Sequence, residues 1–304
     1  MIMNVCLATD NNYARHCGVT IASILDNKAD SDQLHFYVFN NNLSPANMDR
    51  LLNLKRIKPC SIEFIKIAHE QTALFPLLKS KNISRATWLR ISIASNLCYL
   101  GKGLYLDSDL IIMESLASLY DTDISDFYGA MVIDGPAQKM EKVLGMTNSY
   151  YNAGVLLINC VRWREDGLES KMLQWALCNS ELMLYADQDA INSITDGKIK
   201  TIDPRYNTFE EVYNKGAFDL KPVIIHLVGR QKPWNPMSRR PSSVEYFKYL
   251  SLTDWSRDKY FYFLRMLLKI VAECTINFLK MILHKISPSL FMRVKKIYFG
   301  GYEK

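Results

Sequence analysis

Two acidic residues, Asp107 and Asp109, directly follow the short apolar run Leu104–Leu106. Side chains alternate between the two faces of an extended chain, so these carboxylates are expected to point the same way. Two carboxylates held side by side need a cation between them, or one of them must keep its proton. A divalent metal that bridges a diphosphate meets that need. The alternative is a polar turn after a strand.

Polar residues also follow the first apolar run of the chain, Met3–Ala8. The sequence continues there as Thr9-Asp10-Asn11-Asn12-Tyr13. Oxygen acceptors at the end of a first strand can hold a nucleobase and a ribose, and the Tyr13 ring offers a surface for stacking. The alternative is that these residues cap the N-terminus of a helix.

Three later segments also combine polar side chains with an apolar run or with glycine: Tyr151–Asn159, Tyr185–Asn192 and His226–Trp234. A lone histidine is more often a hydrogen-bonded core residue than a metal ligand. Here Gly229 and the run Lys232-Pro233-Trp234 favour a functional histidine at position 226.

These segments need a scaffold that brings them together. Apolar runs predict strands over Met3–Ala8, Leu34–Phe39, Ile62–Ile67, Leu104–Leu106, Tyr128–Ile133, Val155–Ile158 and Val223–His226. Helical patterns predict helices over Cys17–Leu25, from a Ser44 cap to about Ile57, and over Thr87–Leu100, Arg162–Cys178 and Gln188–Ile194. Alternating strands and helices favour a mainly parallel sheet with helices on both faces. Ligands of such sheets bind outside the carboxyl ends of the strands.

The five polar segments, in this order and at this spacing, resemble glycosyltransferase family 8, which contains retaining sugar transferases. The resemblance covers roughly residues 3–250 and is greatest to bacterial lipopolysaccharide galactosyl- and glucosyltransferases. It implies an α/β fold of the Rossmann-like type A with a mixed central sheet. It also implies transfer of a hexose, galactose or glucose, from a UDP-sugar to a saccharide acceptor. Lipopolysaccharide or lipooligosaccharide core, or another glycolipid, is the expected acceptor.

The resemblance also implies the roles of individual residues. The implied metal ligands are Asp107, Asp109 and His226, a set that suits Mn²⁺, with Mg²⁺ as the alternative. The implied catalytic residues, nearest the anomeric carbon, are Asp187 and Gln188. The implied donor-binding residues are Ala8, Asp10, Asn12, Tyr13, Arg90, Asp107, Ser108, Asp134, Asn152, Ala153, Gly154, Gly229 and Lys232.

Cleavage of a sugar–phosphate bond leaves a nucleoside diphosphate and an oxocarbenium-like sugar. The metal, Lys232 and helix N-termini would stabilise the phosphate, and Asp187 could stabilise the sugar cation. Retention can proceed through a sugar bound covalently to Gln188 or Asp187, or through attack on the face that the leaving group vacates. An amide is a poor nucleophile, so we expect same-face attack, while the covalent route stays open.

Residues 251–304 are expected to form a basic tail after a catalytic domain of residues 1–250. Residues 257–304 carry ten Lys/Arg against three Asp/Glu, whereas the rest of the chain carries 27 against 28. At about 100° per residue, one arc holds the polar side chains of Arg265, Lys269, Glu273, Asn277, Lys280 and His284. This pattern predicts an amphipathic helix on an anionic membrane surface. The alternative is a helix packed on the domain or on another subunit.

The location of the charge argues against nucleic acid as a partner, because the net charge of +6 belongs to the tail and not to the folded body. Seven cysteines, without a Cys-x-x-Cys pair, favour free thiols in a reducing compartment. The N-terminal residues show no signal-peptide pattern. We therefore expect a cytoplasmic protein, peripheral on the inner face of the cell membrane.

Three other functions compete with this one. An inactive UDP-sugar-binding module would keep the pocket and lose a catalytic group, but the set of metal and catalytic residues is complete. A nucleotidyltransferase would show a glycine-rich basic loop where Thr9–Tyr13 stands. Glycogenin-like self-glucosylation stays open, as do the choice between glucose and galactose and the oligomeric state.

Overall fold

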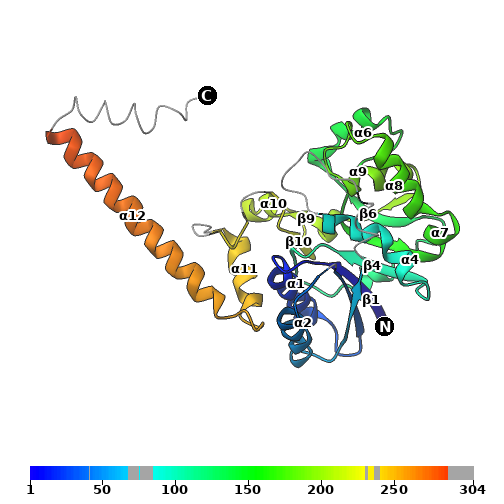
Figure 1. Cartoon of the computed structure of the whole chain (residues 1–304), viewed down its shortest axis with the longest axis horizontal. Coiled ribbons are helices and arrows are strands. Elements are labelled where there is room, and N and C mark those ends of the chain that lie inside the picture. Colours follow the sequence, from blue (N-terminus) through cyan, green and yellow to red (C-terminus); the bar gives the residue numbers. More distant parts are fainter. Residues whose placement is uncertain (41, 68–74, 76–84, 230–231, 236–239, 287–304) are drawn as a thin grey trace.

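The computed structural model describes residues 1–40, 42–67, 75, 85–229, 232–235 and 240–286. Figure 1 shows a central sheet with helices on both sides and a long C-terminal helix that leaves the body. A second, smaller sheet lies beside the central one.

The central sheet has seven strands in the order β3-β2-β1-β4-β7-β6-β8. Their bounds are β1 (Ile2–Ala8), β2 (Gln33–Asn40), β3 (Ser61–Lys66), β4 (Lys102–Leu106), β6 (Gly129–Ile133), β7 (Tyr151–Asn159) and β8 (Ile199–Thr201). All neighbouring pairs are parallel except that β7 runs antiparallel to both β4 and β6. The sheet is therefore mainly parallel, as expected, and β7 makes it mixed, as the resemblance implied. The connection from β6 to β7 stays at one end of the sheet, so β7 returns in the opposite direction.

The smaller sheet has three strands, β5 (Leu110–Ile112), β10 (Ile224–His226) and β9 (Thr208–Phe209). β10 pairs antiparallel with β5 and parallel with β9. In this register His226 lies opposite Leu110, the residue after Asp109. The pairing therefore carries the histidine to the acidic pair, although the two segments are far apart in the sequence.

Two helices, α1 (Ala14–Asn27) and α2 (Pro45–Leu52), cover one face of the central sheet, and α11 (Pro241–Leu250) packs against α1. The predicted cap of α2 is confirmed, because Ser44 Oγ accepts a hydrogen bond from the Asn47 amide at 3.4 Å. α2 ends at Leu52, and a short 3₁₀ helix, η1 (Asn53–Arg56), completes the segment predicted as one helix.

The other face is covered by η2 (Arg85–Ser92), α4 (Ile93–Asn96), α7 (Cys160–Glu165), α8 (Leu168–Cys178) and α9 (Asp187–Ile194). The helix predicted over 87–100 is thus a 3₁₀ helix followed by one α-helical turn. The helix predicted over 162–178 is two helices, because Gly167 adopts a φ of +61° between them. Short helices connect the remaining strands: α5 (Ala117–Tyr120), η3 (Gly135–Ala137), α6 (Lys139–Leu144), η4 (Pro204–Asn207) and α10 (Glu210–Lys215).

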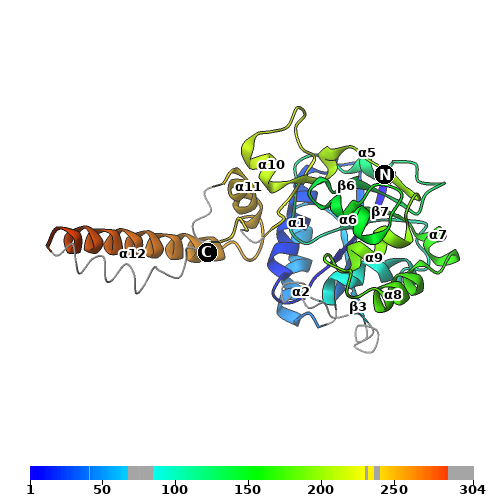
Figure 2. The same cartoon turned by 90° about the horizontal axis from the view of Figure 1, so that it is seen from above.

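The last helix, α12 (Asp258–Ile286), projects from the body, as Figure 2 shows from a second direction. An ion pair of 2.9 Å between Arg15 and Asp258 ties its first residue to α1. The helix predicted over 260–286 is confirmed, whereas residues 289–299 lie outside the described residues. Trp255 belongs to the core, a few residues beyond the domain boundary expected at 250, which stays a prediction. Among the described residues, no helix is long and apolar enough to cross a membrane.

Candidate active site

Two carboxylates and an imidazole converge at the carboxyl end of β4. Among the described residues, Asp107, Asp109 and His226 each offer a ligand atom, and these atoms lie within 4.8 Å of one another. His226 Nε2 lies 3.7 Å from Asp107 Oδ2 and 3.5 Å from Asp109 Oδ1. The predicted ligand set is therefore assembled in space.

The other oxygen of each carboxylate already has partners. Asp107 Oδ1 accepts a hydrogen bond from the Tyr105 hydroxyl at 2.6 Å and lies 3.1 Å from Arg90 Nη2. Asp109 Oδ2 accepts a hydrogen bond from Lys232 Nζ at 2.7 Å. Although burial acts to raise it, the Lys232 ammonium holds the pKa of Asp109 well below its usual value. One oxygen of each carboxylate is left facing the histidine.

Asn207 fixes the histidine so that its free nitrogen faces those oxygens. Asn207 Nδ2 donates to Asn152 Oδ1 at 2.8 Å, and Asn207 Oδ1 lies 2.8 Å from His226 Nδ1. The amide oxygen can only accept, so His226 Nδ1 carries a proton, and in the neutral form of the ring Nε2 then keeps its lone pair. This is the arrangement of a metal-ligating histidine with a supporting hydrogen bond. The donor set fits Mn²⁺, which accepts mixed oxygen and nitrogen ligands.

Gly154 leaves the space in which these ligands meet. A Cβ atom at this position would lie 2.3 Å from His226 Cε1 and 2.9 Å from Asp107 Oδ2. Both distances are far below van der Waals contact, so a side chain here would displace the ligands. The glycine that the resemblance implies as a donor contact is thus also required by the packing of the metal site.

Arg90 links the metal site to the implied catalytic residues. Its buried guanidinium donates to the Ala153 carbonyl at 2.6 Å, and its Nε lies 2.6 Å from Asp187 Oδ2 while the Nε hydrogen is directed to the Thr87 carbonyl. Burial raises the pKa of Asp187 to about 6, although Arg90 acts to lower it. One cation therefore holds two carboxylates, Asp107 and Asp187, in a buried site.

Gln188 is held at both ends of its amide. Its Oε1 accepts a hydrogen bond from the Ala153 amide at 3.0 Å. Its Nε2 donates to Asp134 Oδ2 and to the Tyr150 hydroxyl, each at 3.2 Å. Asp134 Oδ2 also accepts a hydrogen bond from Asn152 Nδ2 at 2.9 Å. A chain of hydrogen bonds therefore runs from Gln188 through Asp134, Asn152 and Asn207 to His226, one of the implied metal ligands.

Asp189 lies behind Gln188 in the protein interior and supports it through Tyr150. It is fully buried; its Oδ1 accepts a hydrogen bond from the Tyr150 hydroxyl at 2.5 Å, and its Oδ2 accepts from the amides of Leu184 and Tyr185 at 2.7 Å. The turn between Tyr185 and Asp189 contains Ala186, which has a φ of +54°. Ala186 is the only non-glycine residue with positive φ in the described chain. Such strain is concentrated at functional sites, where surrounding bonds enforce it.

The residues implied to bind uridine lie where β1 ends. Asp10 Oδ1 accepts hydrogen bonds from the amides of Asn12 and Tyr13 at 2.9 Å and so holds the turn before α1. In the described part of the chain the start of α1 itself has no side-chain capping bond, so the alternative interpretation as a helix cap is not confirmed. Ser108 Oγ donates to the Ala8 carbonyl at 2.7 Å and ties this segment to the acidic pair. The exposed Tyr13 ring lies edge-on to Trp234 at 6.5 Å. The segment therefore lies against both the metal site and the Lys232–Trp234 run.

Gly229 and Lys232 occupy the loop after β10. Gly229 has a φ of +87°, which favours glycine, and within the part of the chain that the structure describes no neighbour lies within 4 Å of an added Cβ. The Lys232 ammonium contacts Asp109 and the Leu227 carbonyl. The loop thus presents a bare backbone and a cation beside the acidic pair.

Sequence reasoning missed three supporting residues, Asn207, Tyr150 and Asp189. Asp189 belongs to the polar segment Tyr185–Asn192, so its acidic side chain could have indicated a role in the site. Asn207 and Tyr150 belong to no pattern, and only the fold shows that they contact His226 and Gln188.

Comparison with known proteins agrees with this geometry. Residues 4–238 match the family model described as Glycosyl transferase family 8. General stress protein A of Bacillus subtilis is 27% identical, over 84% of this chain and 95% of its own. Lipopolysaccharide 1,3-galactosyltransferase of Salmonella typhimurium is 27% identical, over 83% of this chain and 79% of its own.

The fold also matches a solved structure of this kind. Galactosyltransferase LgtC in complex with donor and acceptor sugar analogues superimposes with a TM-score of 0.76 at 27% identity, covering 83% of this chain and 96% of LgtC. This likeness confirms the type-A fold with a mixed central sheet that the resemblance implied. The chain belongs to glycosyl transferase family 8.

Proposed function

We propose that this chain is a metal-dependent, retaining hexosyltransferase that moves galactose or glucose from a UDP-sugar to a saccharide acceptor. The acceptor is lipopolysaccharide or lipooligosaccharide core, or another glycolipid. The observation that carries the proposal is the convergence of ligand atoms of Asp107, Asp109 and His226 beside the buried Asp187 and the half-buried Gln188. The similarity to LgtC and to the Salmonella galactosyltransferase supports a hexose donor.

Donor binding uses the residues gathered around the ends of β1 and β4. Asp107, Asp109 and His226 would hold Mn²⁺, with Mg²⁺ as the alternative, and the ion would neutralise the leaving diphosphate as a Lewis acid. Lys232 adds a cation to the same side of the site, and Gly229 lets the backbone approach. The exposed Tyr13 ring is placed to stack on the uracil.

The sugar side of the site favours same-face attack over a covalent intermediate. The oxygen of the Gln188 amide is its nucleophilic atom, and this oxygen already accepts a hydrogen bond from the Ala153 amide at 3.0 Å. Arg90 holds Asp187 in the site, and we assign to the Asp187 carboxylate the stabilisation of positive charge on the sugar, as the resemblance implies. The leaving phosphate would then take the proton of the acceptor hydroxyl.

The competing proposal is an inactive module that binds a UDP-sugar. To separate the two, purified protein is incubated with Mn²⁺ and a panel of UDP-sugars while UDP release is followed. We expect hydrolysis of UDP-galactose or UDP-glucose, with the released sugar first appearing as the α anomer by proton NMR. Metal-dependent UDP binding without turnover, with or without acceptors, would support the inactive module. Release of the β anomer would contradict retention.

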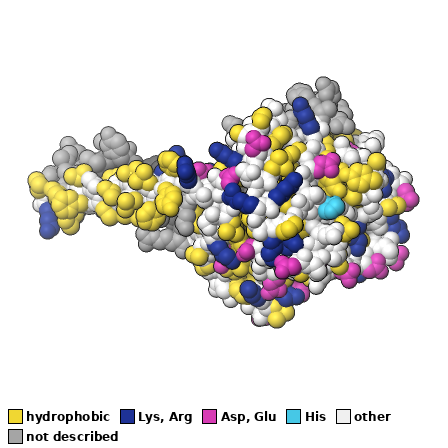
Figure 3. All heavy atoms as spheres, turned by 90° about the horizontal axis from the view of Figure 1, so that it is seen from below, with side chains coloured by type: hydrophobic (Ala, Val, Ile, Leu, Met, Phe, Trp, Pro, Cys, Tyr) yellow, Lys and Arg dark blue, Asp and Glu magenta, His cyan; other side chains and the backbone are white. Residues whose placement is uncertain are grey.

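We further propose that α12 attaches the protein to an anionic membrane surface on the cytoplasmic side. Figure 3 shows the helix as a rod largely covered by hydrophobic side chains, beside a body whose surface mixes both charges. Large apolar side chains are more than half exposed along it, including Phe261, Phe263, Leu268, Val271 and Phe278. Burial of such a face in the membrane interface, with basic residues near the headgroups, would cover this surface.

Liposome flotation tests this attachment. The full chain should float with vesicles that contain phosphatidylglycerol, and flotation should weaken as salt is raised. A chain that ends at Arg257, which keeps the core residue Trp255 and lacks α12, should stay in the aqueous fraction. Equal flotation of both proteins would contradict membrane attachment through α12. Dimerisation of the full chain without flotation would support packing of α12 on another subunit.

A further inference from the structure

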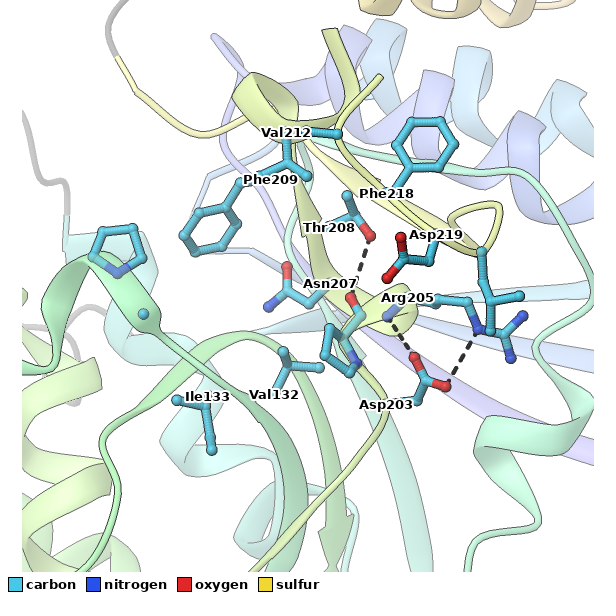
Figure 4. Close-up of a pocket in the computed structure, with 15 residues that line it drawn as sticks. Val132, Ile133, Asp203, Arg205, Asn207, Thr208, Phe209, Val212, Phe218 and Asp219 are labelled. Carbon is cyan, nitrogen blue, oxygen red and sulfur yellow. Dashed lines mark hydrogen bonds and ion pairs between the residues drawn. The ribbon is translucent and has the colours of Figure 1, made fainter. Parts of the chain in front are cut away.

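The candidate metal site is bordered by a pocket beside His226 and by aromatic rings beside Asp109. On the His226 side, Asn207 lines the open pocket that Figure 4 shows. On the Asp109 side, the Lys232 ammonium is bonded to the carboxylate and lies 5.7 Å from the centroid of the Trp234 ring. The rings around Trp234 therefore border the only part of the loop after β10 that brings a cation to the acidic pair in the described chain.

A tight turn joins Trp234 to Lys232. The Asn235 amide donates to the Lys232 carbonyl at 2.9 Å, and the buried Pro233 occupies the second position of this turn. Proline fixes its φ near the value of about −65° that a turn requires there. The turn limits how far the indole ring and the ammonium can move apart, so a contact that holds the ring also limits where the ammonium lies.

His16, in the first turn of α1, holds the Trp234 ring. The imidazole and indole rings are stacked, with centroids 3.7 Å apart and an interplanar angle of 23°. His16 is 4% exposed, and its Nδ1 lies 2.7 Å from the hydroxyl of Tyr246 on α11. This hydrogen bond limits rotation of the imidazole about its Cβ–Cγ bond, so the ring keeps its face toward the indole. Tyr246 adds a tilted contact to Trp234 at 5.0 Å.

The imidazole makes this contact as an uncharged ring. Burial and then the positive charge of Arg15 lower the pKa of His16 to about 3. A neutral ring does not repel the Lys232 ammonium, which an imidazolium would do. Stacked aromatic rings also attract each other beyond the apolar area that they bury. The flat, uncharged shape of the side chain at position 16 is therefore what holds Trp234.

We propose that His16 is a positioning residue of the donor site, which holds Trp234 through ring stacking and thereby keeps the Lys232 ammonium beside Asp109. The proposal rests on the proposed transferase function, in which Lys232 binds the diphosphate of the donor. It extends the donor site from the loop after β10 to the first turn of α1. A residue that is far from the loop in the sequence then sets the affinity of the loop for phosphate.

A double-mutant cycle tests whether His16 acts through Lys232. Titration calorimetry with UDP in the presence of Mn²⁺ is carried out on His16→Asn, Lys232→Ala and the double variant. We expect each single variant to lose about tenfold in UDP affinity, and the double variant to lose no more than Lys232→Ala alone, because residues that act as one unit are not additive. His35→Asn on β2 is the matched control and should bind UDP as the wild type does. Losses that multiply to about 100-fold in the double variant would overturn the proposal.

A conservative variant separates the ring contact from the hydrogen bond. His16→Phe keeps a ring to stack on Trp234, so its UDP affinity should stay within about threefold of the wild type. His16→Asn keeps a polar group near the Tyr246 hydroxyl and should nevertheless show the full loss. The opposite order of the two variants would overturn the proposal, because it would assign the effect to the bond with Tyr246.

The reactivity of Lys232 provides a second measurement that needs neither donor nor metal. Acylation of Lys232 is read by mass spectrometry against that of the exposed Lys215. We expect it to be several-fold faster in His16→Asn than in the wild type and unchanged in His16→Phe. Trp234→Leu removes the same ring contact at a half-buried position and repeats both measurements if His16→Asn does not fold. Equal acylation of Lys232 in all these proteins would overturn the proposal.

The outcomes distinguish this proposal from the proposed function. A wild type that binds no UDP in the presence of Mn²⁺ would count against the transferase, while the acylation of Lys232 would still decide the role of His16. Release of UDP from a UDP-sugar by the wild type, together with unchanged acylation of Lys232 in His16→Asn, would overturn the role of His16 and leave the transferase standing.

Discussion

Asn207 Oδ1 lies 2.8 Å from His226 Nδ1, and the same Asn207 side chain donates to Asn152 Oδ1 at 2.8 Å. The asparagine therefore sets both the proton position and the orientation of the imidazole. It also connects the histidine to the segment that contacts Gln188 through Asp134. A metal bound at His226 and the amide of Gln188 are thus positioned by one continuous set of side chains.

Loss of the Asn207 side chain should weaken metal binding. Asn207→Ala removes the acceptor on His226 Nδ1, and such supporting bonds contribute about 10- to 100-fold to metal affinity. Titration calorimetry with Mn²⁺ in the presence of UDP measures the effect. Asn179→Ala serves as the control, because Asn179 bonds only a helix carbonyl in α8. Equal Mn²⁺ affinity in both variants would contradict the role of Asn207.

Gly154 should tolerate no side chain. Gly154→Ala places a Cβ 2.3 Å from His226 Cε1, so we expect loss of Mn²⁺ binding and a destabilisation of about 1–3 kcal/mol from overpacking. Gly101→Ala is the matched control, since nothing lies within 4 Å of its added Cβ. That variant should stay within about 1 kcal/mol of the wild type. Urea unfolding and Mn²⁺ titration measure both properties, and normal Mn²⁺ binding by a folded Gly154→Ala would refute the packing argument.

Asp187 should destabilise the metal-free protein at neutral pH. Its pKa is raised from an ordinary 3.8 to about 6, so the folded state holds the proton more tightly than the unfolded state. The stability contributed by the protonated group is present below the unfolded pKa and is lost as pH rises from roughly 4 to 6. Asp187→Asn, which mimics the neutral form, should be more stable at pH 7.5 by up to about 3 kcal/mol.

The pH dependence of that difference provides the check. Denaturant unfolding of both proteins from pH 7.5 to pH 4 should show the advantage of Asp187→Asn shrinking as the wild-type carboxyl becomes protonated. The same variant should lose about 100-fold or more in donor hydrolysis, because it lacks the charge that stabilises the sugar cation. A constant stability difference across this range would show that the carboxyl is ionised throughout.

Tyr150 should affect turnover more than binding. Its hydroxyl accepts a hydrogen bond from Gln188 and donates one to Asp189, so Tyr150→Phe leaves the Gln188 amide less constrained. We expect kcat to fall about tenfold and the KM for the donor to stay within about twofold, the signature of a contact used in the transition state. A rise in KM alone would place Tyr150 in ground-state binding instead.

The acidic pair of the candidate metal site could be predicted from residue type and position, because Asp107 and Asp109 follow an apolar strand. His226 also ends a strand, but its role as the third ligand came from the family resemblance and not from its own pattern. The direction of β7 left no such signal, since an apolar run reads the same in either direction. Asn207 was hidden for a different reason. Its role depends on the pairing of β10 with β5 and β9, two strands of three and two residues that are too short to show a period.

The measurement that tests the central claim most directly is UDP release from UDP-galactose and UDP-glucose by protein stripped of metal and then supplied with Mn²⁺. Asp109→Asn, which keeps the shape of the side chain and removes its charge, is measured alongside the wild type. The account predicts turnover only with added metal, and at least about a 100-fold loss in the variant. Turnover that is equal with and without metal, or equal in Asp109→Asn, would contradict it.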